Sequence, residues 1–98
     1  MHSTYGLATK VTAHQGRHAD LIGVLADVSR EVFNVPGCTS YVVSTVLSQP
    51  DDVFIVEFWA SRDHQRSAFA MAGIFELANQ FHTLAAHIEQ HELVPLTN

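Results

Sequence analysis

The sequence predicts an α+β domain whose strands and helices follow in the order β-α-β-β-α-β. Three observations support this prediction: an amphipathic segment over residues 17–33, two adjacent segments rich in Val, Thr and aromatic residues, and a second amphipathic segment after Ser61. The chain has 98 residues, and we expect residues 1–98 to form a single domain.

The first strand and the first helix are predicted from their different periodicities. Residues 5–14 alternate well enough between their two sides to favour a strand. In residues 17–33, apolar side chains recur every three or four positions, as on one face of a helix: Leu21, Leu25, Val28 and Val32. Pro36 and Gly37 end the helix, because proline cannot continue it and glycine tolerates a positive φ.

A hairpin follows in the sequence. Residues 38–48 and 53–59 are rich in β-branched and aromatic side chains, which favour strands. Between them, residues 49–52 read Gln-Pro-Asp-Asp, which is typical of a turn. We therefore expect the two segments to pair as an antiparallel hairpin.

The C-terminal third is expected to form a helix and a last strand. Ser61 is a good N-cap for a helix over residues 63–72, and we expect Gly73 to interrupt this helix before it continues over residues 74–86. Residues 87–96 alternate weakly and are interpreted as the last strand.

This order of elements is that of the ferredoxin-like fold. It places both helices on one face of an antiparallel sheet, and the other face should be polar in an isolated domain. Residues 53–59 are apolar on both faces, with Phe54, Val56 and Phe58 on one side and Val53, Ile55 and Trp59 on the other. We therefore expect a homodimer, in which a second sheet covers the exposed face.

Composition supports a second buried surface and excludes several partners. Hydrophobic residues make up 47% of the chain and charged residues only 15%, against about 25% in average globular proteins. Such an excess indicates a partner subunit or a ligand cavity. The net charge is −5 and the five Lys and Arg residues are scattered, so neither nucleic acid nor an anionic membrane surface is an expected partner.

We expect a cytoplasmic protein without bound metal or nucleotide. One cysteine excludes an internal disulfide, and there is neither a secretion signal nor an apolar stretch of about 20 residues. His87 and His91 would lie about 13 Å apart on a strand, which is too far for one ion. The glycine-rich, Gly-x-Ser-x-Gly and His-Glu-x-x-His motifs are missing, so no cofactor is expected.

Three residues near the end of the hairpin are candidates for chemistry. Glu57 lies in an otherwise apolar strand, so it is either a structural carboxylate bonded to a neighbouring strand or subunit, or a functional one. Trp59 is either core or a flat wall for a ring-shaped ligand. His64 is a candidate base because its ordinary pKa is near neutral, and the alternative is a solvent-exposed helix histidine.

The chain resembles the antibiotic biosynthesis monooxygenase (ABM) family of dimeric α+β barrels. The most specific stretch is Val56-Glu57-Phe58-Trp59 followed by Ser61, His64 and Ser67. Further matches lie in the first predicted strand, before the first helix and in the hairpin: Tyr5-Gly6-Leu7, Gly16, Pro36-Gly37-Cys38, Ser40-Tyr41-Val42-Val43 and Pro50-Asp51.

The resemblance implies a ferredoxin-like dimer and one of several activities. Some members of the family oxidise quinols or aromatic polyketides with O₂ and without metal, flavin or haem, and others degrade haem. The haem-degrading branch has a ligating histidine where this chain reads Ser67-Ala68-Phe69-Ala70-Met71, which argues against that activity. The polyketide branch has an Asn before the Trp and a Tyr after it, where this chain has Ile55 and Gln65.

We therefore expect a cofactor-independent monooxygenase that oxidises a small hydroxylated aromatic, a quinol or a phenolic polyketide, with O₂. His64 is the expected base, Glu57 orients it or the substrate, and these two border one cavity with Trp59. Substrate-binding candidates are Tyr41, Tyr5 and Ser67. The alternative is a non-catalytic module of the same dimeric fold that binds a small ligand.

Overall fold

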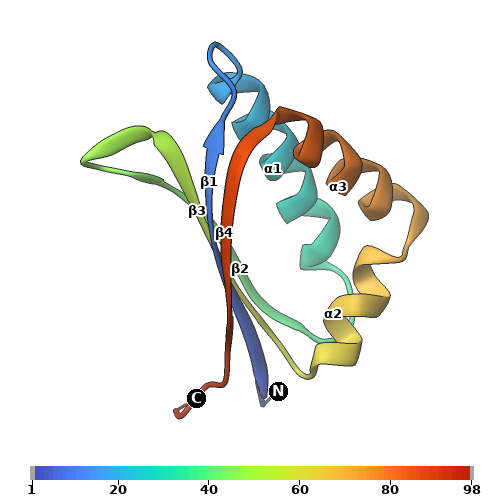
Figure 1. Cartoon of the computed structure of the whole chain (residues 1–98). Helices are drawn as coiled ribbons and strands as arrows, with labels where there is room; N and C mark the ends of the chain where they lie inside the picture. Colours follow the sequence, from blue (N-terminus) through green and yellow to red (C-terminus); the bar gives the residue numbers. More distant parts are fainter. Residues whose placement is uncertain (1, 98) are drawn as a thin grey trace.

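Figure 1 shows the computed structural model, in which residues 2–97 are described. Within them, the chain forms these strands and helices: β1 (Tyr5–Ala13), α1 (His18–Phe33), β2 (Cys38–Val46), β3 (Gln49–Trp59), α2 (Arg62–Phe69), α3 (Ala72–Leu84) and β4 (Ala85–Leu93). The strands pair antiparallel in the order β2-β3-β1-β4. Figure 1 shows that the helices lie on one side of this sheet. The predicted α+β ferredoxin-like fold is therefore confirmed.

The helical face of the sheet holds the core, as the periodicity of the sequence predicts. The four apolar residues predicted on one face of α1 are all buried. The N-terminal half of α1 packs on one cluster, which contains Val11, Val53, Ile55 and Leu84. Its C-terminal half packs on a second cluster, which contains Trp59, Ala68 and Ile74.

The break between α2 and α3 lies at Ala70 and Met71, so the prediction that Gly73 interrupts the helix is wrong. Met71 has an extended backbone (φ −68°, ψ 135°) and precedes the first turn of α3. Gly73 lies inside α3, where open space surrounds the position of a side chain. The earlier break redirects the chain so that Ile74 reaches the core beside Trp59.

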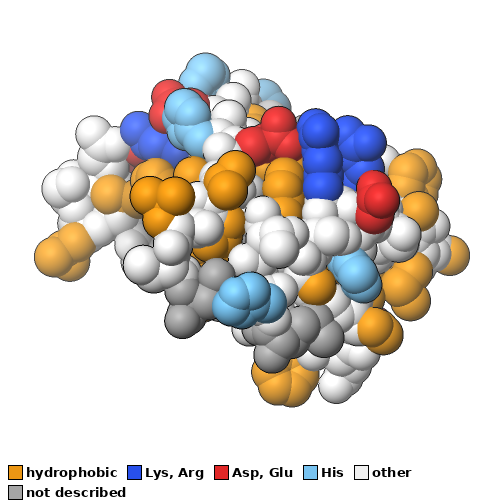
Figure 2. Space-filling view, turned by 90° about the horizontal axis from the view of Figure 1, so that it is seen from below, with side chains coloured by type: hydrophobic (Ala, Val, Ile, Leu, Met, Phe, Trp, Pro, Cys, Tyr) orange, Lys and Arg blue, Asp and Glu red, His pale blue; other side chains and the backbone are white. Residues whose placement is uncertain are grey.

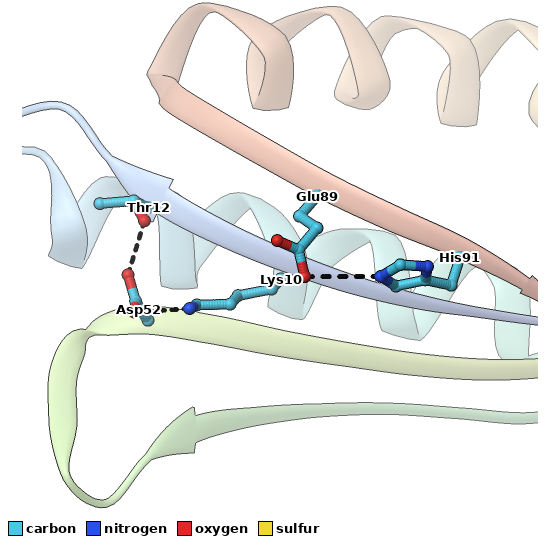
Figure 3. A network of polar contacts seen from close by, with 5 residues as sticks. All are labelled: Lys10, Thr12, Asp52, Glu89 and His91. Carbon is cyan, nitrogen blue, oxygen red and sulfur yellow. Dashed lines mark hydrogen bonds and ion pairs between the residues drawn. The ribbon is translucent and has the colours of Figure 1, made fainter.

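The hairpin turn is shorter than predicted, because β3 begins at Gln49. The expectation that residues 49–52 form the turn is wrong. Asp52 is buried. Its carboxylate accepts a hydrogen bond from the Thr12 hydroxyl (2.6 Å) and forms an ion pair with Lys10 (3.7 Å) (Figure 3). These contacts tie the start of β3 to β1. Pro50 lies where the two hairpin strands are out of register, so its missing N–H removes no ladder bond.

The outer face of the sheet is apolar over β2 and β3 and polar over β1 and β4. Val42 and Phe54 are 53% and 37% exposed on it. Across β1 and β4, Lys10 and the Glu89–His91 pair lie on the same face (Figure 3). The prediction of two apolar faces is thus confirmed for the half of the sheet made by the hairpin. None of the helices in residues 2–97 is long and apolar enough to cross a membrane.

Candidate functional site

A cavity of about 380 Å³ lies between the inner face of the sheet and the helices. Its size is at the lower end of the roughly 300–1,000 Å³ that small-molecule sites occupy. Apolar side chains from every helix and from three strands line it: Leu7, Leu25, Val28, Ile55, Phe69, Phe75, Ala78, Phe81 and Ile88. Its polar lining consists of Thr9, Tyr41, Glu57, Gln65, Asn79, His82 and Gln90.

The cavity has a closed end at β2 and β3 and an open end at α3 and β4. Glu57 is only 4% exposed and Leu25 only 2%, so the closed end is shielded from solvent. By contrast, Phe75 is 55% and Ile88 is 36% exposed. A ligand would enter between α3 and β4 and place its far end against Glu57.

Glu57 owes its position to the alternation of β3. It lies between Leu7 of β1 and Tyr41 of β2, on the same face as Trp59 two residues later. The indole Nε1–H of Trp59 donates a hydrogen bond to Glu57 Oε1 at 2.9 Å. The hydrogen-bond partners of Glu57 are therefore Trp59 of the same strand and Gln65 of α2.

Burial raises the pKa of Glu57 to about 7, although the hydrogen bonds from Trp59 and Gln65 act in the opposite direction. Near neutral pH, both the protonated and the ionised form of this carboxyl group are therefore populated. A buried carboxyl group with such a pKa can accept a proton from a ligand and release it again.

Tyr41 lies directly across from Glu57 and lines the same cavity. Burial raises its pKa, and the negative charge of Glu57 raises it further. The phenol therefore stays protonated and is a hydrogen-bond donor at physiological pH.

Trp59 supports the cavity from behind. It is fully buried, and its ring meets Phe69 in an edge-to-face contact with centroids 6.3 Å apart. Phe69 lines the cavity, whereas Trp59 does not. Phe69, and not Trp59 as predicted, therefore forms this part of the cavity wall, and Trp59 packs against Phe69 from behind.

His64 faces away from the cavity. It occupies the third position of α2, where its backbone N–H donates to the N-cap oxygen of Ser61 (3.2 Å) and its Nδ1 lies 2.6 Å from the same oxygen. Since Ser61 Oγ already accepts one bond, its own proton is available to Nδ1. The imidazole ring packs on Gly37 (φ +92°), where an added Cβ would collide with it.

The expectation that Glu57, Trp59 and His64 border one cavity is therefore wrong. His64 and Ser67 line a separate hollow between α2 and residues 35–36, together with Met71. One residue along a helix turns the side chain by about 100°, and this step brings Gln65 into the cavity.

Tyr5 lies next to the cavity. Its hydroxyl donates to Glu92 at 2.7 Å, and Arg62 pairs with the same carboxylate at 3.0 Å. These residues line a second hollow, which has Leu7, Gln65 and Gln90 in common with the cavity.

The sequence reasoning missed most of the polar lining. Gln90 of β4 donates to Thr9 Oγ1 at 2.9 Å, and His82 and Asn79 of α3 lie across from this pair on the cavity wall. The signal that identifies such residues is a polar side chain at a position that should face the helices. Gln90 and Glu92 occupy two such positions in β4.

Within residues 2–97, no group of three or more His, Cys, Asp or Glu side chains is arranged to hold a metal ion.

The comparison with protein families identifies the chain. Residues 4–72 match the model of the family described as antibiotic biosynthesis monooxygenase. The chain belongs to this family. None of the curated proteins compared with it gives a match.

Several solved structures have the same fold as this chain. A protein from Chloroflexus aurantiacus J-10-fl assigned to these monooxygenases is 31% identical, with a TM-score of 0.86 over 98% of this chain and 96% of its own. A protein from Deinococcus radiodurans, also assigned to these monooxygenases, is 20% identical, with a TM-score of 0.84 over 96% of this chain and 94% of its own. SnoaB of Streptomyces nogalater, described as a cofactor-independent oxygenase, is 18% identical (TM-score 0.86; 99% and 97% covered).

Replacing Glu57 by Gln should stabilise the protein increasingly as pH rises. The folded protein binds the Glu57 proton more tightly than the unfolded chain does, so the carboxyl group reduces stability as pH rises from 4.5 to about 7, and this loss persists above that range. The gain of Glu57→Gln over the parent should grow between pH 5 and pH 8 by about 3 kcal/mol at most. Chemical denaturation at each pH measures it.

The matched control for this prediction is Glu31→Gln, because Glu31 is exposed on α1. It should show no comparable growth in stability. A constant difference between Glu57→Gln and the parent at every pH would contradict the raised pKa.

Replacing His64 by Ala should reduce stability and leave the cavity intact. Loss of the imidazole contacts with Ser61 and Gly37 should lower the free energy of unfolding by about 1 kcal/mol. Binding of 1-naphthol, measured by fluorescence, should be unchanged, whereas His82→Ala should weaken it. A His64→Ala variant of parental stability that no longer binds 1-naphthol would place His64 in the site after all.

Proposed function

We propose that this ABM protein is a cofactor-independent monooxygenase that oxidises a small hydroxylated aromatic with O₂, and that Glu57 takes up the phenolic proton of the substrate. The observation that carries the proposal is a buried carboxyl group, with a pKa of about 7, at the closed end of an apolar cavity. The description of SnoaB as a cofactor-independent oxygenase of the same fold supports it.

The proposed reaction needs one proton acceptor and a shielded space. Ionised Glu57 removes the proton of a phenolic O–H, and the phenolate that forms is electron-rich enough to react with O₂. A ring carbon of the phenolate bonds to one oxygen atom of O₂, and the peroxide anion that forms takes the proton back from Glu57 to give a hydroperoxide. This carbon then loses its proton as the O–O bond breaks, so that water leaves and a quinone carbonyl remains. A phenol and O₂ thus give a quinone and water.

The remaining lining supplies orientation and exclusion of water. Phe69, Phe81 and Ile55 form flat or apolar walls that suit an aromatic ring. Tyr41 and Gln65 line the cavity next to Glu57 and can donate hydrogen bonds to oxygen atoms of the substrate. An apolar site also protects a reactive phenolate and a hydroperoxide from solvent.

The dimer is a second part of the proposal. Val42 and Phe54 are exposed on the outer sheet face, where Lys10 of β1 pairs with Asp52 of β3 and Glu89 pairs with His91 within β4. A second copy related by a two-fold axis would cover this face with an identical sheet. The cavity lies on the opposite side, so each subunit would keep its own site.

Oxygen uptake tests the enzymatic proposal. The parent protein should accelerate O₂ consumption by 1,4-dihydroxynaphthalene above the rate in buffer alone. The rate should fall as pH drops below about 7, because Glu57 must be ionised to act as a base. Glu57→Gln should lower kcat by roughly 10²–10⁴, the usual contribution of a general base, whereas Glu31→Gln should not.

Two results would count against a role of Glu57 in catalysis. Full activity of a folded Glu57→Gln variant would exclude it as the base. Tight binding of 1-naphthol without any oxygen uptake by a panel of quinols would favour the alternative, a non-catalytic ligand-binding module.

Light scattering tests the dimer. The protein at micromolar concentration should have about twice the 10.8 kDa mass of the chain. Val42→Lys combined with Phe54→Lys should give monomers, because two cations would be buried in the interface. Met71→Lys replaces an equally exposed apolar residue on the helical side and should stay dimeric. A monomeric parent protein would contradict the proposed assembly.

A further inference from the structure

A second hollow, of about 540 Å³, continues the cavity between α2 and β4. Leu7, Gln65 and Gln90 line both spaces, so a ligand in the cavity can extend into the hollow. The new lining is polar, and Arg62 and Arg66 of α2 contribute to it. The hollow is therefore chemically different from the apolar cavity that it joins.

Arg66 differs from every other cation in the described part of the chain. Four of the five Lys and Arg residues form ion pairs, with these partners: Lys10 with Asp52, Arg17 with Asp20, Arg30 with Asp27 and Arg62 with Glu92. Within residues 2–97, no carboxylate lies within ion-pair distance (4.0 Å) of Arg66. Its guanidinium group remains available to a ligand.

The position of Arg66 is fixed relative to Glu57 by the helix. Arg62 and Arg66 are four residues apart and thus neighbours on one face of α2. Gln65 lies between them in sequence and lines both spaces, and its side chain hydrogen bonds to Glu57. An elongated ligand that touches Glu57 at one end can therefore approach Arg66 at the other.

The charges of the hollow favour one negative charge on the ligand. Glu92 is already held by Arg62 and by the hydroxyl of Tyr5. This leaves one guanidinium charge in excess in a chain whose net charge is −5. Seen from the end of the molecule where α2 lies, basic side chains lie side by side between acidic ones, next to hydrophobic groups (Figure 2).

We propose that the aromatic ligand of this protein carries a carboxylate and that Arg66 binds this carboxylate while the ring occupies the cavity. The inference rests on the proposed function only in placing an aromatic ring in the cavity. A guanidinium group matches a carboxylate with two parallel N–H···O bonds, which explains an arginine at this position. Arg66 thus selects hydroxylated aromatic acids over neutral phenols.

Calorimetric titration with two matched probes tests the proposal. 5-Hydroxy-2-naphthoate and 1-naphthol share the ring and the hydroxyl and differ in the carboxylate, which lies on the opposite ring from the hydroxyl. The parent protein should bind the acid about tenfold more tightly than the neutral phenol. Arg66→Gln should abolish this preference and leave the affinity for 1-naphthol unchanged. Arg30→Gln, which changes an exposed arginine on α1, should keep the preference.

Three results would overturn the proposal: equal affinities for the two probes in the parent protein, a preference that persists in Arg66→Gln, or no binding of either probe. A different result would disprove the proposed monooxygenase activity and leave the carboxylate site standing. A preference for the acid that depends on Arg66, combined with no oxygen uptake on 5,8-dihydroxy-2-naphthoate, would retain the carboxylate site and reject the reaction.

Discussion

The hydrogen bond from the Trp59 indole to Glu57 determines the character of the cavity. A carboxyl group in an apolar strand needs a partner, because burial without one destabilises the fold. Trp59 supplies one donor, from the same strand and the same face. This donor satisfies one oxygen without cancelling the effect of burial, so the pKa of Glu57 stays raised. The bond also directs the indole toward the core and leaves the cavity to Glu57.

The cavity exists because the inner face of the sheet changes character from strand to strand. β1 and β3 present Val11, Val53 and Ile55 to the helices, and these residues are packed in the core. β4 presents Ile88, Gln90 and Glu92 at the equivalent positions, and all three are exposed. Polar side chains there cannot be packed under an apolar helix face without losing hydrogen bonds to water. The packed half gives rigidity and the open half leaves room for a ligand.

The fold was predictable from the sequence because periodicity reports directly on burial. The four apolar residues of α1 are all buried, and the two faces of β3 separate as the alternation requires. The same reasoning identified Glu57 as anomalous, because a single charged residue in an apolar strand is visible without a structure. Local deviations were not predictable: Asp52 extends β3 through contacts with Thr12 and Lys10, which are distant in sequence.

The candidate site was only partly predictable, because the rotation of a helix about its axis determines which of its side chains face the cavity. His64 and Gln65 are adjacent in sequence and face different hollows. The choice between them follows from the capping interaction with Ser61 and the fit against Gly37. The hydrogen-bond partner of Trp59 was equally hidden, since a strand-end Trp can use its N–H in several directions.

The central claim is that Glu57 lies in a ligand cavity and exchanges its proton near neutral pH. Carbon NMR of glutamate side-chain carboxyl groups, compared between the parent protein and Glu57→Gln, identifies the Glu57 signal and follows its titration. The account predicts a midpoint of about 7 and a change in this midpoint when 1-naphthol is bound. A midpoint in the ordinary range of glutamate, unaffected by the ligand, would contradict it.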